Sequence, residues 1–157
     1  MRRTTLLVLL AALLAAAPAE ARKGDAWATV NVCDTATNPN TIGIRGSMPG
    51  LKRKARLTMR FRVQYLDDGV WRLVRKGADS GHQPVATARR GRHDAGWSFK
   101  FEPPESGPAI ELRGLVIFTW KRSGQTVRRE RHTTTAGHPG TAGADPADYS
   151  AESCYIA

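Results

Sequence analysis

The sequence has few carboxylates and lacks the short motifs that usually mark a hydrolase. Its 14 acidic residues face 24 lysines and arginines, which gives a formal net charge of +10. No Gly-x-Ser-x-Gly motif is present, and the Gly46-Ser47 pair lacks the context of a nucleophile elbow. The one adjacent acidic pair, Asp67-Asp68, is explained by a turn. The sequence therefore predicts that the protein is not an enzyme.

Metal-ligating side chains are also few, and they are widely spaced. The sequence has four histidines, and no two of them have the short spacing that is typical of zinc ligands. His132 and His138 are the nearest pair, with no cysteine or carboxylate beside them in a ligand pattern. We expect neither a metal site nor a cofactor.

Long apolar runs are confined to the N-terminus. Leu6 to Ala17 follows a basic start and precedes small residues suited to signal peptidase, with cleavage between Ala19 and Ala21. The run is short for a membrane span, although an uncleaved anchor helix is the alternative. We expect a signal peptide over residues 1–21 and a single secreted or extracytoplasmic domain over 22–157, without a membrane span in the mature chain.

The sequence contains only two cysteines, Cys33 and Cys154, which lie near opposite ends of the mature chain. Export places them in an oxidising compartment, where an even number of cysteines indicates pairing. We predict a Cys33–Cys154 disulfide that fastens the first strand to the last. Two buried free thiols are the alternative.

The clearest structural pattern runs from Ala55 to Tyr65 (ARLTMRFRVQY). Apolar and polar residues alternate there with a period of two, as they do in a strand with one buried and one wet face. We expect a central strand of an antiparallel domain. Its predicted core residues are Leu57, Met59, Phe61, Val63 and Tyr65, sharing a two-sheet core with Trp97, Phe99, Val116 and Phe118.

Further short strands and turns follow the same logic. Asp68-Gly69 and Ser123-Gly124 are typical of tight hairpins, whereas the charged stretch from Arg89 to Gly96 is expected to be a turn. No helical period is visible. The other predicted strands are Trp27–Cys33, Ile42–Gly46, Val70–Val74, Val85–Arg89, Trp97–Phe101, Leu112–Trp120, Gln125–Thr135 and Tyr155–Ile156. The sequence predicts an all-β, antiparallel, immunoglobulin-like β-sandwich of about eight strands, with a small β-barrel as the alternative.

The wet face of the central strand is the candidate binding surface. Lys54, Arg56, Arg60 and Arg62 follow one register on it, and the arginines near residue 130 add further charge. Arginine matches phosphate and carboxylate oxygens with two parallel hydrogen bonds, so the stripe can bind an anionic polymer. A merely solvated face is the alternative. Nucleic acid is disfavoured as a ligand, because an exported protein is separated from the nucleic acids of the cell. Aromatic residues also do not interleave with the arginines.

The strand from Leu112 to Trp120 is apolar on both faces. Leu115 and Ile117 lie on the face opposite the expected core, where they form a candidate apolar interaction patch. The alternative is that the C-terminal tail or a neighbouring loop covers them.

Two C-terminal stretches, TTTAGH (Thr133 to His138) and GADPADYSAESC (Gly143 to Cys154), carry a family resemblance. They resemble uncharacterised small exported bacterial proteins with an immunoglobulin-like sandwich and a cysteine near each end. The resemblance implies export and a disulfide, and it carries over no catalytic or ligand residue.

Together these patterns predict an exported binding or adhesive module at the cell surface, for anionic envelope polymers or a protein partner. A small secreted hydrolase and a purely structural accessory domain are the alternatives.

Overall fold

The computed structural model describes residues 25–103 and 106–157. The predicted signal peptide and its cleavage site lie outside the described residues. Within the described ranges the chain forms nine strands and no helix. The strands are β1 (Trp27–Cys33), β2 (Thr41–Pro49), β3 (Ala55–Asp67), β4 (Val70–Leu73), β5 (Gln83–Ala88), β6 (Arg92–Lys100), β7 (Ile110–Arg122), β8 (Gln125–Thr133) and β9 (Ser153–Ile156).

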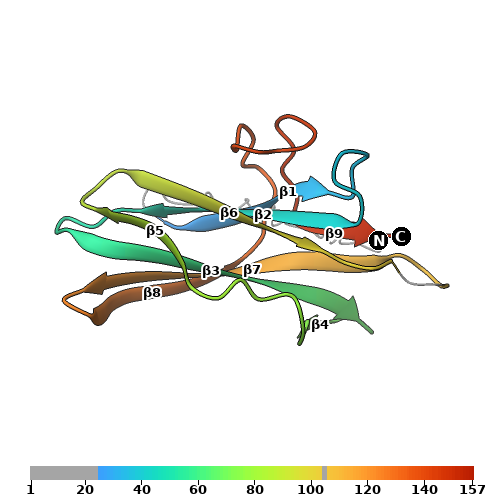
Figure 1. Cartoon of the computed structure of the whole chain (residues 1–157), viewed down its shortest axis with the longest axis horizontal. Coiled ribbons are helices and arrows are strands. Elements are labelled where there is room, and N and C mark those ends of the chain that lie inside the picture. The colour runs from blue at the N-terminus through green and yellow to red at the C-terminus, as the bar shows by residue number, and fades with distance from the viewer. Residues whose placement is uncertain (1–24, 104–105) are drawn as a thin grey trace, which may run out of the picture.

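The strands form two stacked antiparallel sheets (Figure 1). The small sheet has the order β1-β2-β6, and the large sheet has the order β4-β3-β7-β8, with β5 also pairing with β3 and β9 with β7. The predicted β-sandwich is confirmed. The barrel alternative is wrong, because the strands divide between two separate sheets that do not close on each other.

The pairing order matches an immunoglobulin-like sandwich. In that fold strands A, B, E and D form one sheet while C, F and G form the other. Here β1, β2 and β6 take the places of A, B and E, and β3, β7 and β8 take those of C, F and G, with β4 as an added edge strand. The strand β5 departs from this pattern, because it pairs with β3 in the large sheet and not with β6. The disulfide differs from the one in antibody domains, because it does not join β2 to β7.

Two long central strands set the dimensions of the large sheet. β3 and β7 each have 13 residues and pair with each other over most of their length. Each outer side of this pair is completed by two short strands, β5 and β4 along β3, and β8 and β9 along β7. The outer face of this sheet is consequently long, and alternate residues of β3 and β7 project from it.

The core lies between the two sheets and is built by the alternation seen in the sequence. Leu57, Met59, Phe61 and Val63 are fully buried, as predicted, and Tyr65 packs at the margin. Trp97 departs from the prediction, because 41% of it is exposed. It lies on β6, the edge strand of the small sheet, where the opposing sheet does not cover it fully.

The strand β6 begins earlier than the sequence indicated. The predicted turn over Arg89 to Gly96 is wrong beyond Gly91, because β6 starts at Arg92. The reason is β2, which continues to Pro49 and pairs with β6 along its whole length. Backbone groups of β2 need hydrogen-bond partners, and this requirement outweighs the local turn propensity of β6.

Both predicted hairpin turns are confirmed. Asp68 and Gly69 have φ values of 47° and 77°, and Ser123 and Gly124 have values of 48° and 81°. These positive angles at both central residues are those of the turn type that suits a tight hairpin. The second turn connects β8 to the end of β7, which pairs with the start of β3.

The disulfide between Cys33 and Cys154 is present and joins the two sheets. It links the end of β1 to β9, with a Cα–Cα distance of 5.4 Å. Both cysteines are consumed by it, so the free-thiol alternative is wrong.

The segment between β8 and β9 runs along β1, an edge strand of the small sheet (Figure 1). Thr29 Oγ1 and Ser150 Oγ are 2.8 Å apart, and the Asp145 backbone N–H donates to the Asn31 carbonyl at 2.9 Å. The protein's own chain thus covers β1, whereas β6 at the other edge of the small sheet keeps exposed residues such as Asp94, Ser98 and Lys100. The outer face of the large sheet carries charged side chains.

Candidate anion-binding face

The outer face of the large sheet collects cations from three strands. Register partners on neighbouring strands project to the same side of a sheet, so the pairing of β3, β7 and β8 places them together. We call this surface the basic face. Its cations are Arg56, Arg60 and Arg62 on β3, Arg113 and Lys121 on β7, and Arg129 and Arg131 on β8.

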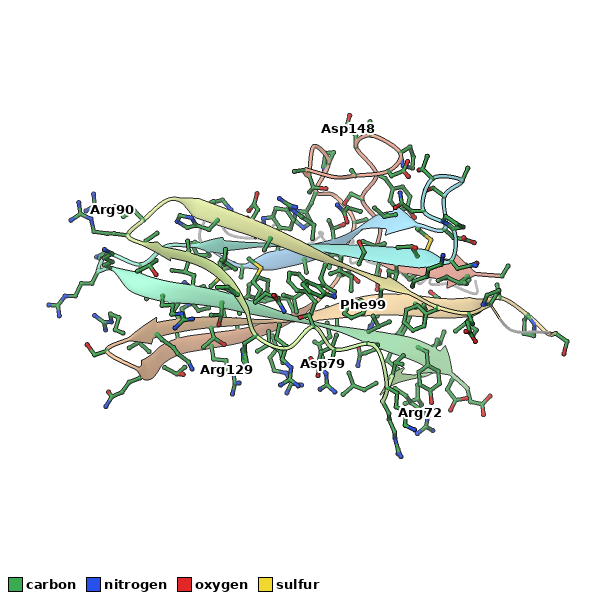
Figure 2. The ribbon with its side chains drawn as sticks, viewed as in Figure 1. Arg72, Asp79, Arg90, Phe99, Arg129 and Asp148 are labelled. Carbon is green, nitrogen blue, oxygen red and sulfur yellow. A yellow bond between two sulfur atoms is a disulfide. The ribbon has the colours of Figure 1, made fainter. Side chains whose placement is uncertain are left out.

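Figure 2 shows Arg129 and Asp79 on the same side of the molecule, facing away from the small sheet. Arg129 and Arg131 are both exposed, and neither belongs to an ion pair among the described residues. The local sequence indicated that arginines near residue 130 add charge. Only the pairing of β8 with β7 shows which of them join the stripe on β3.

Arg128 does not join the basic face. Its register partner is Trp120, a core residue, and its guanidinium lies 4.7 Å from the centroid of the Trp120 ring. Its Nε also donates to Glu130 at 2.6 Å. Burial alone would raise the pKa of Glu130, but hydrogen bonds from His132 and Arg128 prevail and lower it. These residues form a structural cluster along the β8 edge.

The predicted apolar patch is not exposed. Leu115 and Ile117 project to the outer face, yet only 7% and 8% of them is accessible. Ile117 has Arg60 as its register partner on one side and Arg131 on the other, and Leu115 has Arg62. Arginine stems can cover apolar neighbours while their charged ends remain in water. The apolar strip is the floor of the basic face and not a separate binding patch.

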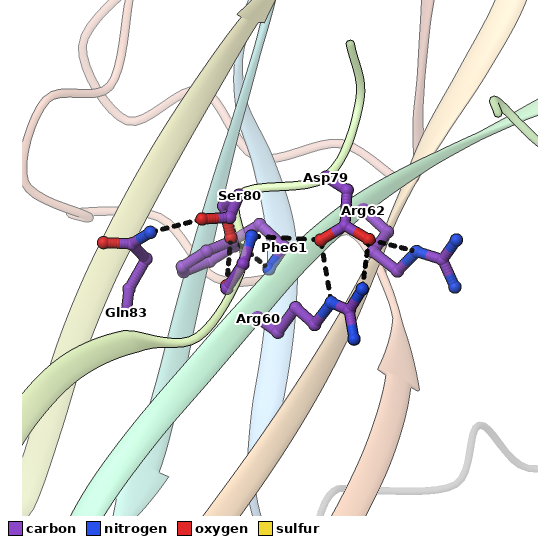
Figure 3. Close-up of polar contacts among 7 residues, drawn as sticks. Arg60, Phe61, Arg62, Asp79, Ser80 and Gln83 are labelled. Atoms are coloured by element: carbon purple, nitrogen blue, oxygen red, sulfur yellow. Dashed lines mark hydrogen bonds and ion pairs between the residues drawn. The ribbon is translucent and has the colours of Figure 1, made fainter. Parts of the chain in front are cut away.

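Asp79 neutralises part of the arginine stripe (Figure 3). Arg60 Nε donates to Asp79 Oδ1 at 2.7 Å, and Arg62 Nε lies 3.2 Å from Asp79 Oδ2. The hydrogen bond from Arg60 is the main cause of the lowered pKa of the Asp79 carboxyl, and the same bond raises the pKa of Arg60. Two predicted site arginines therefore share one carboxylate and contribute less charge than the sequence indicated.

The segment that carries Asp79 is held firmly against β3. The Phe61 backbone N–H donates to Ser80 Oγ at 2.9 Å, and the Ser80 N–H donates to the Phe61 carbonyl at 3.0 Å (Figure 3). The Gly81 N–H in turn donates to Asp79 Oδ1 at 3.0 Å. Sequence reasoning missed this carboxylate, since Asp79 is 17 positions from Arg62 in a polar loop.

The other predicted site residues, Lys54 and Arg56, lie at the far end of the basic face. They line a hollow of about 600 Å³ beside the β7–β8 turn, which we call the basic hollow. Its lining residues are Arg53, Lys54, Ala55, Arg56, Thr87, Lys121, Arg122, Ser123 and Gly124. Five of these nine are cationic and none is acidic, so the hollow is strongly electropositive.

A second hollow, of about 650 Å³, bears on the hydrolase alternative. It lies beside β1, where Trp27 and His138 stack with their ring centroids 4.1 Å apart. Thr135 Oγ1 is 3.2 Å from His138 Nε2, and burial lowers the pKa of that histidine. A nucleophile and base also need a third group that orients the base, and no side-chain carboxylate bonds to His138 among the described residues.

In the two ranges that the structure describes, no three histidine, cysteine or acidic side chains come together as a metal-binding group. The same ranges contain no helix with the length and apolar character needed to cross a membrane.

Fold and site together define a disulfide-linked, immunoglobulin-like β-sandwich with a basic outer face. Comparison of the chain with protein-family models, with curated proteins and with solved structures finds no match. The function of the protein is therefore inferred from the residues of this chain alone.

Proposed function

We propose that the protein is an exported, non-catalytic module that binds an anionic polymer of the cell envelope along the basic face. The observation that carries this proposal is the pair of arginine rows on β3 and β8, which run along both sides of β7. Each row presents guanidinium groups on the same outer surface. Export follows from the predicted signal peptide, and the disulfide between β1 and β9 is consistent with an oxidising compartment.

The dimensions of the basic face suit an extended ligand. The rows on β3 and β8 are two strand spacings apart, about 10 Å, and Arg56 to Arg62 spans about 20 Å along β3. A small anion touches only a fraction of such an area. A linear polymer with regularly spaced charges can follow the whole row.

The arginine rows are suited to bind an anionic polymer through many weak electrostatic contacts and not through one tight, specific contact. Arg129 and Arg131 are unpaired among the described residues, whereas Arg60 and Arg62 keep Asp79 between them. Guanidinium groups bind phosphate or carboxylate oxygens with two hydrogen bonds, and their weak hydration reduces the cost of contact. Many such exposed contacts together give binding that weakens steadily as salt is added.

Co-sedimentation of the mature protein with insoluble envelope polymers, over a series of salt concentrations, tests this proposal. We expect retention at low salt that declines smoothly with ionic strength. The double variant Arg129→Gln/Arg131→Gln should be released at clearly lower salt than the parent protein, because it lacks the unpaired row on β8.

The matched control removes two charges elsewhere. Arg90 lies in the turn between β5 and β6, Lys100 is the last residue of β6, and both are exposed. The double variant Arg90→Gln/Lys100→Gln has the same net charge as the test variant and should be retained like the parent. Equal loss of retention in both variants would show that net charge, and not the basic face, is responsible. No retention of the parent protein at low salt would reject polymer binding.

A further inference from the structure

We infer that the basic hollow binds one compact, doubly charged phosphoryl group, such as a phosphomonoester. The geometry of the hollow alone supports a site for a phosphoryl group. The further step, that this group is the end of an envelope polymer, rests on the proposed function. The group is recognised by charge density, because five cations from two chain segments line the hollow.

Two cations in the hollow oppose each other directly across the sheet. Arg56 on β3 and Lys121 on β7 are register partners, and their outer neighbours in the same row are Thr87 and Thr126. Like charges that lie directly opposite each other across two strands destabilise a sheet. Neither cation has an ion-pair partner among the described residues. A bound anion would relieve this repulsion.

One residue of the lining also has a buried donor without an acceptor. Arg122 Nε is buried, and it has no hydrogen-bond partner within the described part of the chain. A buried donor that loses its water without gaining an acceptor is costly to the folded state. Arg122 lines the hollow, so a rotation of its side chain toward a bound anion would give this donor an acceptor.

A phosphoryl group matches this lining better than a single carboxylate does. A phosphomonoester carries a charge close to −2 near neutral pH and offers three acceptor oxygens. The hydroxyls of Thr87 and Ser123 belong to the same lining and supply neutral donors beside the cations. The hollow is of the size that ligand sites usually have, so part of the group's carrier also fits.

Thermal unfolding of the full mature chain in inorganic phosphate, against acetate at the same ionic strength and pH, tests the site. A phosphate concentration a hundredfold above its Kd should raise Tm by roughly 5–10 °C. Acetate should cause little change. A phosphate-ended oligomer, as the second probe, should give at least the same shift when the carrier also contacts the basic face.

The variant Lys121→Gln separates a ligand site from a merely basic surface. Without ligand, its Tm should rise by about 1–3 °C, because the cross-strand repulsion with Arg56 is gone. The same variant should lose most of the rise that phosphate causes in the parent protein. Arg131→Gln is the matched control, because it removes one charge from the basic face outside the hollow, and it should keep the full phosphate shift.

Two results would overturn the inference. One is an equal Tm rise from acetate and phosphate at the same ionic strength. The other is a Lys121→Gln protein that keeps the phosphate shift. Polymer retention remains a separate readout: a parent protein that binds phosphate but not polymer rejects the proposed function, and the reverse result rejects the phosphoryl site.

Discussion

At the scale of single residues, Asp79 decides how much of the arginine stripe is available. Its carboxylate holds Arg60 through a hydrogen bond and Arg62 through an ion pair, and its own position is fixed by Gly81. The same contacts that order these arginines also withdraw charge from the basic face. Stability and anion affinity are therefore expected to change in opposite directions when Asp79 is altered.

The substitution Asp79→Asn should lower the free energy of unfolding by about 1 kcal/mol, because the charge of the ion pairs is lost. It should also strengthen retention on anionic polymer, since two guanidinium groups gain freedom to bind it. Denaturant titration measures the first effect, and the salt needed for release measures the second. The control Asp67→Asn breaks the exposed pair with Arg72 on another part of the molecule. Weaker polymer retention by Asp79→Asn would contradict the role given to Asp79.

The pKa of Asp79 is lowered mainly by its hydrogen bond from Arg60, and this makes the free energy of unfolding depend on pH in the acidic range. A carboxyl with a lower pKa in the folded state stabilises the protein above its unfolded-state pKa, about 3.9. This contribution is lost as the pH falls through the lower folded-state value. Unfolding titrations at pH 5 and pH 3 should therefore show a smaller loss for Asp79→Asn than for the parent. Equal losses would contradict the assignment.

At the scale of the elements, the alternation in β3 could be predicted from the sequence, but the neighbours of β3 could not. The period of two identified its buried and wet faces correctly. The burial of Leu115 and Ile117 depends on arginines of β3 and β8, which become neighbours only through long-range pairing. The basic hollow could be predicted only in part from the sequence. Lys121 and Arg122, at the β7–β8 turn, are far from Lys54 in the sequence and meet it only in the folded chain.

The contact between the sheets at Gly114 offers a test of the packing. A Cβ atom added there would lie 2.7 Å from Thr134 Cγ2 and 2.9 Å from Ile44 Cδ1. Overpacking of this kind typically costs about 1–3 kcal/mol, so Gly114→Ala should lower the free energy of unfolding by that amount. Denaturant titration against Ser98→Ala, an exposed strand control, measures it. A Gly114→Ala protein as stable as the control would contradict this packing.

At the scale of the whole molecule, the disulfide joins the two sheets through two cysteines that lie near opposite ends of the described chain. It spans a sequence separation of 121 residues. The loop-entropy view gives about 4–5 kcal/mol for a closed loop of this order, as an upper figure. We expect the double variant Cys33→Ser/Cys154→Ser to lose about 2–5 kcal/mol of unfolding free energy, measured by denaturant titration.

The parent protein without reductant should also be lighter by about two hydrogens than the reduced chain in intact mass measurements. Unchanged mass on reduction, or an unchanged free energy of unfolding in the double variant, would contradict the structural role of the bridge.

If the basic face is a surface for an extended anion, it should bind a long polyanion with an affinity that depends on salt. This is tested by the equilibrium affinity of the mature protein for long-chain polyphosphate over a series of salt concentrations. We predict that the logarithm of the affinity falls linearly with the logarithm of salt, and that Arg129→Gln/Arg131→Gln gives a shallower slope than the parent and than Arg90→Gln/Lys100→Gln, because fewer counterions are released. An affinity that does not change with salt, or the same slope in all three proteins, would contradict the claim.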